Sequence, residues 1–151
     1  MYAYNYHGPS GLTAKIKSSS RSYESQKGED FVTESVNRYP GEITIVALGP
    51  LTSIARAFRK DPTLSQRVDR IYVMGGVIEC SGNVTPWAEF NIYDDPVAAN
   101  VVFSKGVPVT LVGLVVCHSV FVNRTNHPWP FVNSSKRSEV CRKILTSWVA
   151  Y

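Results

Sequence analysis

Two asparagines and one glutamate stand close together in an otherwise largely apolar stretch, SGNVTPWAEFNIYDDP, at residues 81–96. Asn83 and Asn91 each offer an amide donor and a carbonyl acceptor, and Glu89 offers two acceptor oxygens. In an extended segment Glu89 and Asn91 would point the same way. Such a set matches a polyol, whose hydroxyls can donate to the glutamate and accept from the asparagines. The alternative is structural: the asparagines serve turns, and the glutamate faces solvent.

Other reactive residue types in this half of the chain have simpler explanations. Asp94 and Asp95 could form a metal pair, but calcium takes about six to eight oxygens from several segments. Asp95 precedes Pro96, so a helix N-cap is the favoured interpretation. Cys117 is interpreted as a small buried hydrophobe in preference to a nucleophile, and His118 as a structural residue. The two asparagines and the glutamate remain the candidate ligand-binding set.

The composition is that of a globular chain. Of its 151 residues, 44% are hydrophobic and 19% are charged, which excludes a disordered chain and allows a sizeable core. No apolar run reaches the length of a membrane span, and the start of the chain lacks the features of a signal peptide. Three cysteines without CxxC spacing argue against a disulfide framework and a zinc site. We therefore expect a cytoplasmic protein without a membrane partner.

The net charge of +4 comes from one end of the chain. Residues 118–151 carry five Lys or Arg and one Glu, whereas the rest of the chain is balanced. Such a basic tail could contact nucleic acid, but it lacks the alternation of aromatic and basic residues that binding motifs show. A solvated basic helix is favoured, and we expect no nucleic-acid partner.

Strand and helix patterns alternate along the chain. Apolar, β-branched runs predict strands, and apolar residues at helical spacing, ended by Pro or Gly, predict helices. The expected helices cover 29–39, 51–60, 63–68 (a single turn), 95–106 and 135–151, and the expected strands cover 42–49, 70–76 and 107–116. Thr52 or Ser53 is the expected cap of the second helix. This order predicts an α/β fold, a Rossmann-like open and mostly parallel sheet flanked by helices with right-handed crossovers.

The chain is expected to form a single domain over 1–151. A loop-rich entry covers 1–29, an irregular segment covers 119–134, and a helix covers 135–151. Ligands of parallel sheets bind beyond the carboxyl ends of the strands. The loop that follows the second strand is too long for an ordinary turn, and loops of this length in compact domains are usually functional or disordered. Its aromatic and aliphatic residues argue against disorder, so we expect it to hold the site.

Several blocks of the chain resemble the inosine–uridine nucleoside hydrolase family. They are VALGPLTSIARAFRKDP, IYVMGG, GNVTPWAEFNIYDDPVAA and VTLVGLVVCH, in this order and spacing, with HGPSGL at 7–12 similar to that family's HGxxGL segment. The GNVTPxAEFN block is specific, whereas LGPLT and MGG would be weak alone. Residues 42–118 form the best-matching core.

The resemblance implies a partial nucleoside hydrolase fold and a reaction. Family members hydrolyse the N-glycosidic bond of ribonucleosides to ribose and free base, and an aspartate cluster, DxDxGxDD, holds calcium and supplies the general base. The transition state resembles an oxocarbenium ion, so charge stabilisation around the ribose matters more than a covalent nucleophile. A ribonucleoside or ribose is thus the expected ligand, calcium the expected cofactor, and a homo-oligomer a possible assembly.

The resemblance also assigns roles to individual residues. Asn83, Glu89 and Asn91 match the ribose-binding positions, and Met74 matches a residue that packs beside the sugar. Leu48 matches the position whose backbone carbonyl binds calcium. His7 lies in the segment that flanks the base, where a histidine could assist the leaving group; the alternative is a loop histidine in a turn rich in Gly and Pro.

The sequence departs from the family pattern in what it lacks. Its five aspartates form no DxDxGxDD cluster, and the family's later His-Asp pair is also missing. Ser53 stands where the family usually has Asn, and Val115 where Asp is frequent. We therefore expect a central portion of the fold that binds ribose but lacks the full catalytic site. The alternative is a non-catalytic binding or interaction module derived from the same fold.

Overall fold

The computed structural model describes residues 25–120 and 135–149. The chain divides into two compact units, one formed by Glu24–Ser119 and the other by Met1–Tyr23 together with Val120–Tyr151. Each unit is described by itself. His7 lies outside the described residues, so its expected role has no structural counterpart here.

The unit Glu24–Ser119 is built on a three-stranded parallel sheet in the order β1-β2-β3. The strands are β1 (Ile43–Ala47), β2 (Val68–Met74) and β3 (Val109–Val112). Ala47 pairs with Val73, and Met74 pairs with Val112, so the carboxyl ends of the strands meet at one edge. The predicted α/β fold with a parallel sheet is confirmed.

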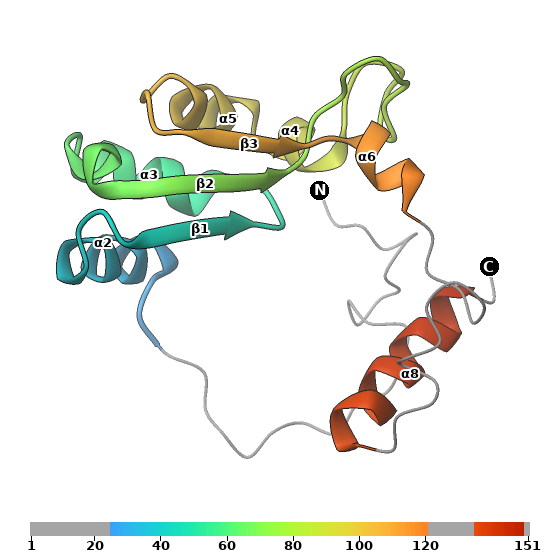
Figure 1. The fold of residues 1–151 in the computed structure, drawn as a ribbon. Coiled ribbons are helices and arrows are strands. Elements are labelled where there is room, and N and C mark those ends of the chain that lie inside the picture. The colour runs from blue at the N-terminus through green and yellow to red at the C-terminus, as the bar shows by residue number, and fades with distance from the viewer. Residues whose placement is uncertain (1–24, 121–134, 150–151) are drawn as a thin grey trace. The chain divides into compact units, whose positions relative to one another are not determined.

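Helices cover one face of this sheet (Figure 1). They are α2 (Gly28–Arg38), α3 (Thr52–Lys60) and α5 (Pro96–Phe103), and the turn η1 (Leu64–Arg67) precedes β2. The core lies between helices and sheet, where Leu51, Phe58 and Val102 meet Ile71 and Val73, all fully buried. Burying a Leu, Val, Ile or Phe side chain stabilises a fold by about 1.5–3 kcal/mol, so this layer holds the unit together.

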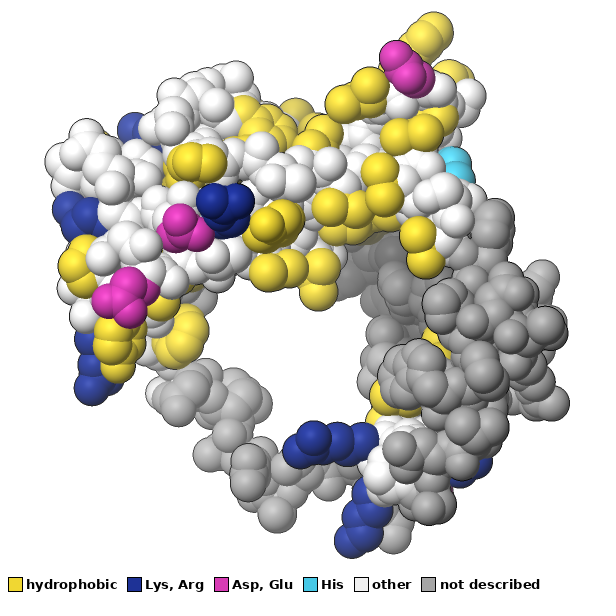
Figure 2. Space-filling view, in the orientation of Figure 1, with side chains coloured by type: hydrophobic (Ala, Val, Ile, Leu, Met, Phe, Trp, Pro, Cys, Tyr) yellow, Lys and Arg dark blue, Asp and Glu magenta, His cyan; other side chains and the backbone are white. Residues whose placement is uncertain are grey.

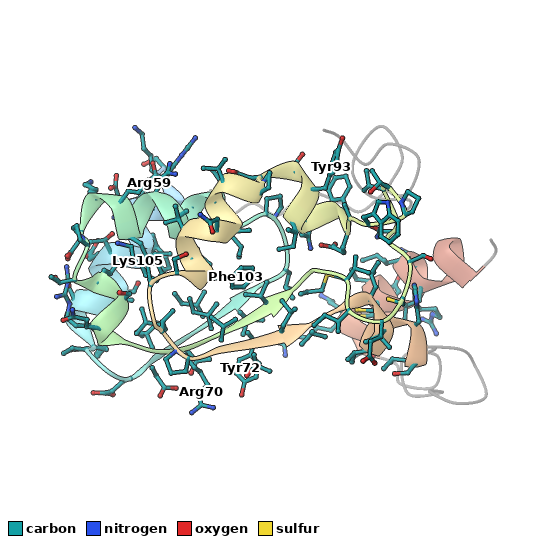
Figure 3. All side chains as sticks on the ribbon, turned by 90° about the horizontal axis from the view of Figure 1, so that it is seen from above. Arg59, Arg70, Tyr72, Tyr93, Phe103 and Lys105 are labelled. Atoms are coloured by element: carbon teal, nitrogen blue, oxygen red, sulfur yellow. The ribbon has the colours of Figure 1, made fainter. Side chains whose placement is uncertain are left out.

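The opposite face of the sheet is turned away from these helices. Alternate strand residues point there, because successive side chains of a strand lie on opposite faces. Figure 2 shows hydrophobic side chains gathered over the strands on this face, beside charged ones. In Figure 3, Arg70 and Tyr72 of β2 extend away from the helices.

Two short helices replace segments that the sequence predicts to be extended or irregular. α4 (Phe90–Asp94) lies in the long loop after β2, and α6 (Leu114–Ser119) begins where the third strand was expected to continue. β3 is correspondingly shorter than 107–116. The chain turns at Gly113, whose neighbour Leu114 donates its N–H to the Gly76 carbonyl at 3.1 Å.

The other unit contributes one described helix, α8 (Lys136–Val149). Ser135 caps it, because its hydroxyl oxygen accepts from the Ser138 N–H at 3.1 Å. A Lys143–Glu139 ion pair at 2.9 Å spans one turn. Over the described ranges, no helix has both the length and the apolarity needed to cross a membrane.

Candidate functional site

Glu89 is the one charged residue of the candidate set, and its side chain is more deeply buried than those of the two asparagines. Its side chain is 2% exposed, and its Oε2 accepts from the Gly76 N–H at 3.0 Å and from the Ile92 N–H at 3.1 Å. The first bond ties the loop to the carboxyl end of β2, and the second caps α4. The alternative in which Glu89 simply faces solvent is therefore wrong. Among the described residues, Glu89 Oε1 receives no hydrogen bond.

Asn91 reaches back to the end of β2 from the first turn of α4. Its Nδ2 donates to the Met74 carbonyl at 2.9 Å and lies 3.1 Å from the Met74 sulfur. The bond to a carbonyl fixes the orientation of the amide, because only the NH2 group can donate. Asn91 is 8% exposed, and its Oδ1 keeps its acceptor capacity.

Asn83 lies at the base of a compact turn formed by residues 82–88. Its Oδ1 accepts from the Phe90 N–H at 2.9 Å, which orients the side chain and leaves Nδ2 as the available donor. Within the turn, Gly82 N–H donates to Pro86 O at 3.0 Å and Val84 N–H to Ala88 O at 3.1 Å. The loop is thus held by its own hydrogen bonds, as expected of a functional loop that must present side chains in fixed places.

Gly82 has no room for a side chain. A Cβ built there would lie 2.3 Å from the carbonyl oxygens of Thr85 and Ala88, which are backbone atoms that cannot turn aside. Gly75 is also crowded, since its Cβ would meet Glu89 Oε2 at 3.2 Å and Ile92 at 3.3 Å. Glycine at both places therefore allows the loop to close on the end of β2.

The geometry of the set differs from the sequence-based expectation. Glu89 is the last extended residue before α4, with φ −87° and ψ 149°, and Asn91 lies within the helix. The two do not share one side of an extended segment. They converge because both side chains fold back on the end of β2, where Met74 supplies a backbone partner.

A cavity of about 420 Å³ also adjoins the loop, but it is separate from the contacts that Asn83 and Asn91 make. Its wall includes Gly76, Glu89, Ile92, Tyr93 and Leu111, but Met74, Asn83 and Asn91 do not line it. The cavity and the polar set share Glu89. The carboxyl end of β2 brings the predicted ribose-binding residues together, so it is the candidate site.

Leu48 follows β1 directly and is 76% exposed. Because Ala47 pairs with Val73, Leu48 lies next to Met74 in the sheet register. Its carbonyl could supply one oxygen to calcium, but calcium takes about six to eight. Among residues 25–120 and 135–149, no three His, Cys, Asp or Glu side chains are grouped to hold a metal. The described residues alone therefore do not fit a calcium site.

Asp95 caps α5, as predicted, and also bonds a residue of α3. Its Oδ1 accepts from the Ala98 N–H at 2.9 Å, and its Oδ2 accepts from the Thr52 hydroxyl at 2.6 Å. The Thr52 hydroxyl, followed by the Ala98 amide, lowers the pKa of Asp95. The expectation that Thr52 or Ser53 caps α3 is wrong: Leu51 is its N-cap, without a side-chain bond, and Thr52 serves Asp95 instead.

Sequence reasoning missed the capping role of Glu89 and the anchoring contacts of the asparagines. Glutamate is not among the preferred N-cap residues, so the residue type gave no cue. The Gly75-Gly76 pair was a visible signal of close backbone approach, but its partner could not be identified without the fold. Cys117 is partly buried and His118 is exposed, both on α6.

Comparison with known proteins places these features in a family. The sequence profile of the inosine-uridine preferring nucleoside hydrolases matches residues 1–149. Uridine nucleosidase 1 of Arabidopsis thaliana is 44% identical over 109 residues, covering 72% of this chain and 32% of that protein. The pyrimidine-specific ribonucleoside hydrolase RihA of Citrobacter koseri is 38% identical over 148 residues, covering 97% of this chain and 47% of that protein.

Solved structures agree with the sequence comparisons. A plant nucleoside hydrolase, PpNRh1, superposes with a TM-score of 0.90 at 36% identity, over 100% of this chain and 48% of that one. A purine-preferring ribonucleoside hydrolase from Gardnerella vaginalis gives a TM-score of 0.90 at 30% identity, over 97% and 47%. The chain thus spans about a third to a half of these relatives. It belongs to the inosine-uridine preferring nucleoside hydrolase family.

Proposed function

We propose that this chain binds the ribose of ribonucleosides through Asn83, Glu89 and Asn91, with Met74 packed beside the sugar. The observation that carries the proposal is shared by the three polar side chains. Each uses one polar atom to bond the backbone, and each keeps a second polar atom unused among the described residues. Side chains anchored in this way lose little conformational freedom on binding, which favours affinity.

The anchoring bonds also determine which side-chain atoms are left to accept a hydrogen bond from a ligand and which are left to donate one. Glu89 Oε1 and Asn91 Oδ1 remain as acceptors, so a ligand must donate to them. Asn83 Nδ2 remains as a donor, so the ligand must also accept. A sugar hydroxyl does both. A carboxylate or phosphate ligand, which only accepts, would be repelled by Glu89.

The reaction that we propose for the complete site is the family reaction, hydrolysis of the N-glycosidic bond to ribose and free base. In the proposed site these residues bind the sugar, whereas the DxDxGxDD cluster that supplies the general base in the family does not occur in this sequence. We therefore propose that this chain alone has little or no hydrolase activity. Calcium remains the proposed cofactor, with the Leu48 carbonyl as one ligand and the others outside the described residues. His7 remains a proposed aid to the leaving group.

The setting of the protein belongs to the same proposal. Composition and cysteine usage support a cytoplasmic location and no membrane or nucleic-acid partner. A homo-oligomer is a further expectation from the family. Salvage of purine and pyrimidine bases is the role that this reaction would serve.

Binding can be tested on the whole chain by NMR. Ribose titrated to millimolar concentration is expected to shift the side-chain amide signals of Asn83 and Asn91, and Asn83→Ala is expected to weaken binding roughly tenfold. The matched control is Asn100→Ala, because Asn100 is an exposed asparagine on α5. Unchanged amide signals at saturating ribose would contradict the proposal.

Turnover is tested separately, by release of free base from inosine and uridine with added calcium. We expect no release above the uncatalysed rate. Efficient calcium-dependent release by this chain would show that its catalytic site is complete and would overturn the proposed lack of activity.

A second candidate function, that of an interaction module, is favoured by the sheet face that faces away from the helices. Its apolar residues Val46 and Leu48 are largely exposed. The two candidate functions are compatible, because the candidate ribose site lies at the end of β2 and the apolar face spans the strands.

A further inference from the structure

The end of β2 brings one side chain to the candidate site. Met74 is the last residue of the strand, and Gly75 and Gly76 follow it. Because successive side chains of a strand lie on opposite faces, Met74 points away from the face on which Val73 is fully buried. The two glycines that follow have no side chain to offer. Met74 is therefore the residue of this strand end whose side chain can contact the loop.

Met74 offers two acceptors to the amide of Asn91. The Asn91 Nδ2 atom lies 2.9 Å from the Met74 carbonyl oxygen and 3.1 Å from the Met74 sulfur. An asparagine NH2 group carries two hydrogens, and a thioether sulfur is a weak acceptor, so this one methionine can satisfy the whole group. Asn91 is 8% exposed, so an amide hydrogen without an acceptor would carry a desolvation cost there.

The two acceptors act together on the orientation of Asn91. If the amide turned over, its Oδ1 would face the Met74 carbonyl and sulfur, and neither of these has a hydrogen to donate. With the carbonyl as the sole partner, one amide hydrogen would stay free to donate to a ligand. With the sulfur as a second partner, Asn91 keeps only its acceptor Oδ1 for the ligand.

Apolar packing is the competing explanation for Met74. Methionine is unbranched and fills irregular gaps, and the Met74 side chain is partly buried. Packing depends on the volume of the side chain, whereas a hydrogen bond requires the sulfur atom itself. The N···S distance of 3.1 Å is shorter than the about 3.5–4.0 Å at which non-bonded carbon atoms pack, which favours the hydrogen bond.

We propose that the Met74 sulfur positions Asn91 by accepting a hydrogen bond from its amide, so that Asn91 meets the ligand as an acceptor only. Met74 is then a positioning residue that acts through Asn91, in addition to its proposed packing beside the sugar. The inference rests on the proposed function in one respect: the group that donates to Asn91 Oδ1 is a ribose hydroxyl. The N–H···S bond is present without sugar, so it can be measured separately.

Replacing the sulfur by a methylene group separates the two explanations. The sequence has two methionines, Met1 and Met74, so norleucine supplied in place of methionine changes one internal site of the whole chain. Norleucine keeps the length of the side chain and nearly its volume, but it has no acceptor. We expect the side-chain amide signals of Asn91 to move in NMR spectra of the sugar-free chain, while those of Asn83 stay. Ribose affinity is expected to fall about two- to fivefold.

Selenomethionine is the conservative replacement, because selenium in the same place is again a weak acceptor. The selenomethionine chain is expected to keep wild-type ribose affinity. A scalar coupling between the selenium nucleus and an amide proton of Asn91 is expected, and it would show the bond directly. The contribution of Met1 is measured on Met74→Leu, in which norleucine enters at position 1 alone. Norleucine should change neither the amide signals nor the ribose affinity of that variant.

Three results would overturn the inference. They are unmoved Asn91 amide signals in the norleucine chain, equal ribose affinity of the norleucine and wild-type chains, and absence of the selenium coupling. The coupling is measured on the selenomethionine chain, so it decides the matter even if the norleucine chain does not fold. Absence of ribose binding by the wild-type chain contradicts the proposed function instead, and the amide signals of the sugar-free chain then still test the N–H···S bond.

Discussion

Glu89 and Asp95 stand a few residues apart, and each caps the helix that follows it. Asp95 uses both carboxylate oxygens within the fold, one for Ala98 and one for Thr52. Glu89 places both of its backbone bonds on Oε2, which leaves Oε1 without a partner among the described residues. The two acids have the same local role but differ in the number of carboxylate oxygens left without a hydrogen bond. A capping residue whose two oxygens both accept bonds within the fold is structural, and one that leaves an oxygen without a bond can also bind a ligand.

The largest expected effect comes from removing the glutamate. Glu89→Ala leaves the Gly76 and Ile92 amides without their acceptor, which should lower the free energy of unfolding by about 2–4 kcal/mol and abolish ribose binding. Glu89→Gln keeps one carbonyl oxygen for these amides but presents an NH2 group in place of Oε1. Denaturant unfolding should then show a smaller loss in the free energy of unfolding than for Glu89→Ala, while ribose affinity still falls roughly tenfold or more. If Glu89→Gln bound the sugar with wild-type affinity, Glu89 Oε1 would not be a ligand-binding atom, and Glu89 would be a structural cap like Asp95.

Next in size is the loop that carries the glutamate. Gly82→Ala forces the turn at 82–88 to shift, because its Cβ would lie 2.3 Å from two backbone oxygens. Ribose affinity measured by NMR titration should fall roughly tenfold, since Asn83 loses its fixed place. Gly49→Ala is the control, because its Cβ meets no atom within 4 Å. Equal affinity for the two variants would show that the turn does not position the site.

A smaller effect is expected at the structural cap. Asp95→Ala removes the acceptor for Ala98 and Thr52 and should cost about 1–2 kcal/mol in denaturant unfolding. Ribose affinity should not change, in contrast to both substitutions of Glu89. A marked loss of sugar binding by Asp95→Ala would mean that the α4–α5 junction, and not Glu89 itself, organises the site.

The smallest effect is the acid dependence of the same cap. The Thr52 hydroxyl and then the Ala98 amide lower the pKa of Asp95 in the folded state. The resulting stability is fully present above the unfolded pKa, near about 3.9, and is lost as pH falls through the lowered folded pKa. Thr52→Val should thus be less stable than wild type at neutral pH, and the difference should shrink below about pH 4. Thr110→Val, on an exposed strand position, should show no such convergence.

The sequence predicted the fold where its signals were local and repeated. Ile54, Ala55 and Phe58 at helical spacing indicated α3, and Asp95 before Pro96 indicated the start of α5; both are confirmed. Val97 stands at helical spacing from Val101 but is 60% exposed, since helical spacing alone does not fix the width of a buried face.

The short helices escaped prediction for physical reasons. α4 has five residues, too few for a helical period to be visible. It begins at Glu89, whose side chain caps it and also bonds the Gly76 N–H beyond the end of β2. α6 begins in an apolar, β-branched run that favours a strand, but Gly113 turns the chain and Leu114 bonds Gly76. Both depend on contacts with β2 or its end, which sequence spacing does not contain.

The closeness of Gly75 to Glu89 has an evolutionary consequence. A Cβ at position 75 would lie 3.2 Å from Glu89 Oε2 and 3.3 Å from Ile92, so a side chain at 75 and a glutamate at 89 compete for one space. Among sequences that share this fold, the two positions should covary: glycine at 75 wherever glutamate is kept at 89, and relaxed choice at 75 where it has been lost.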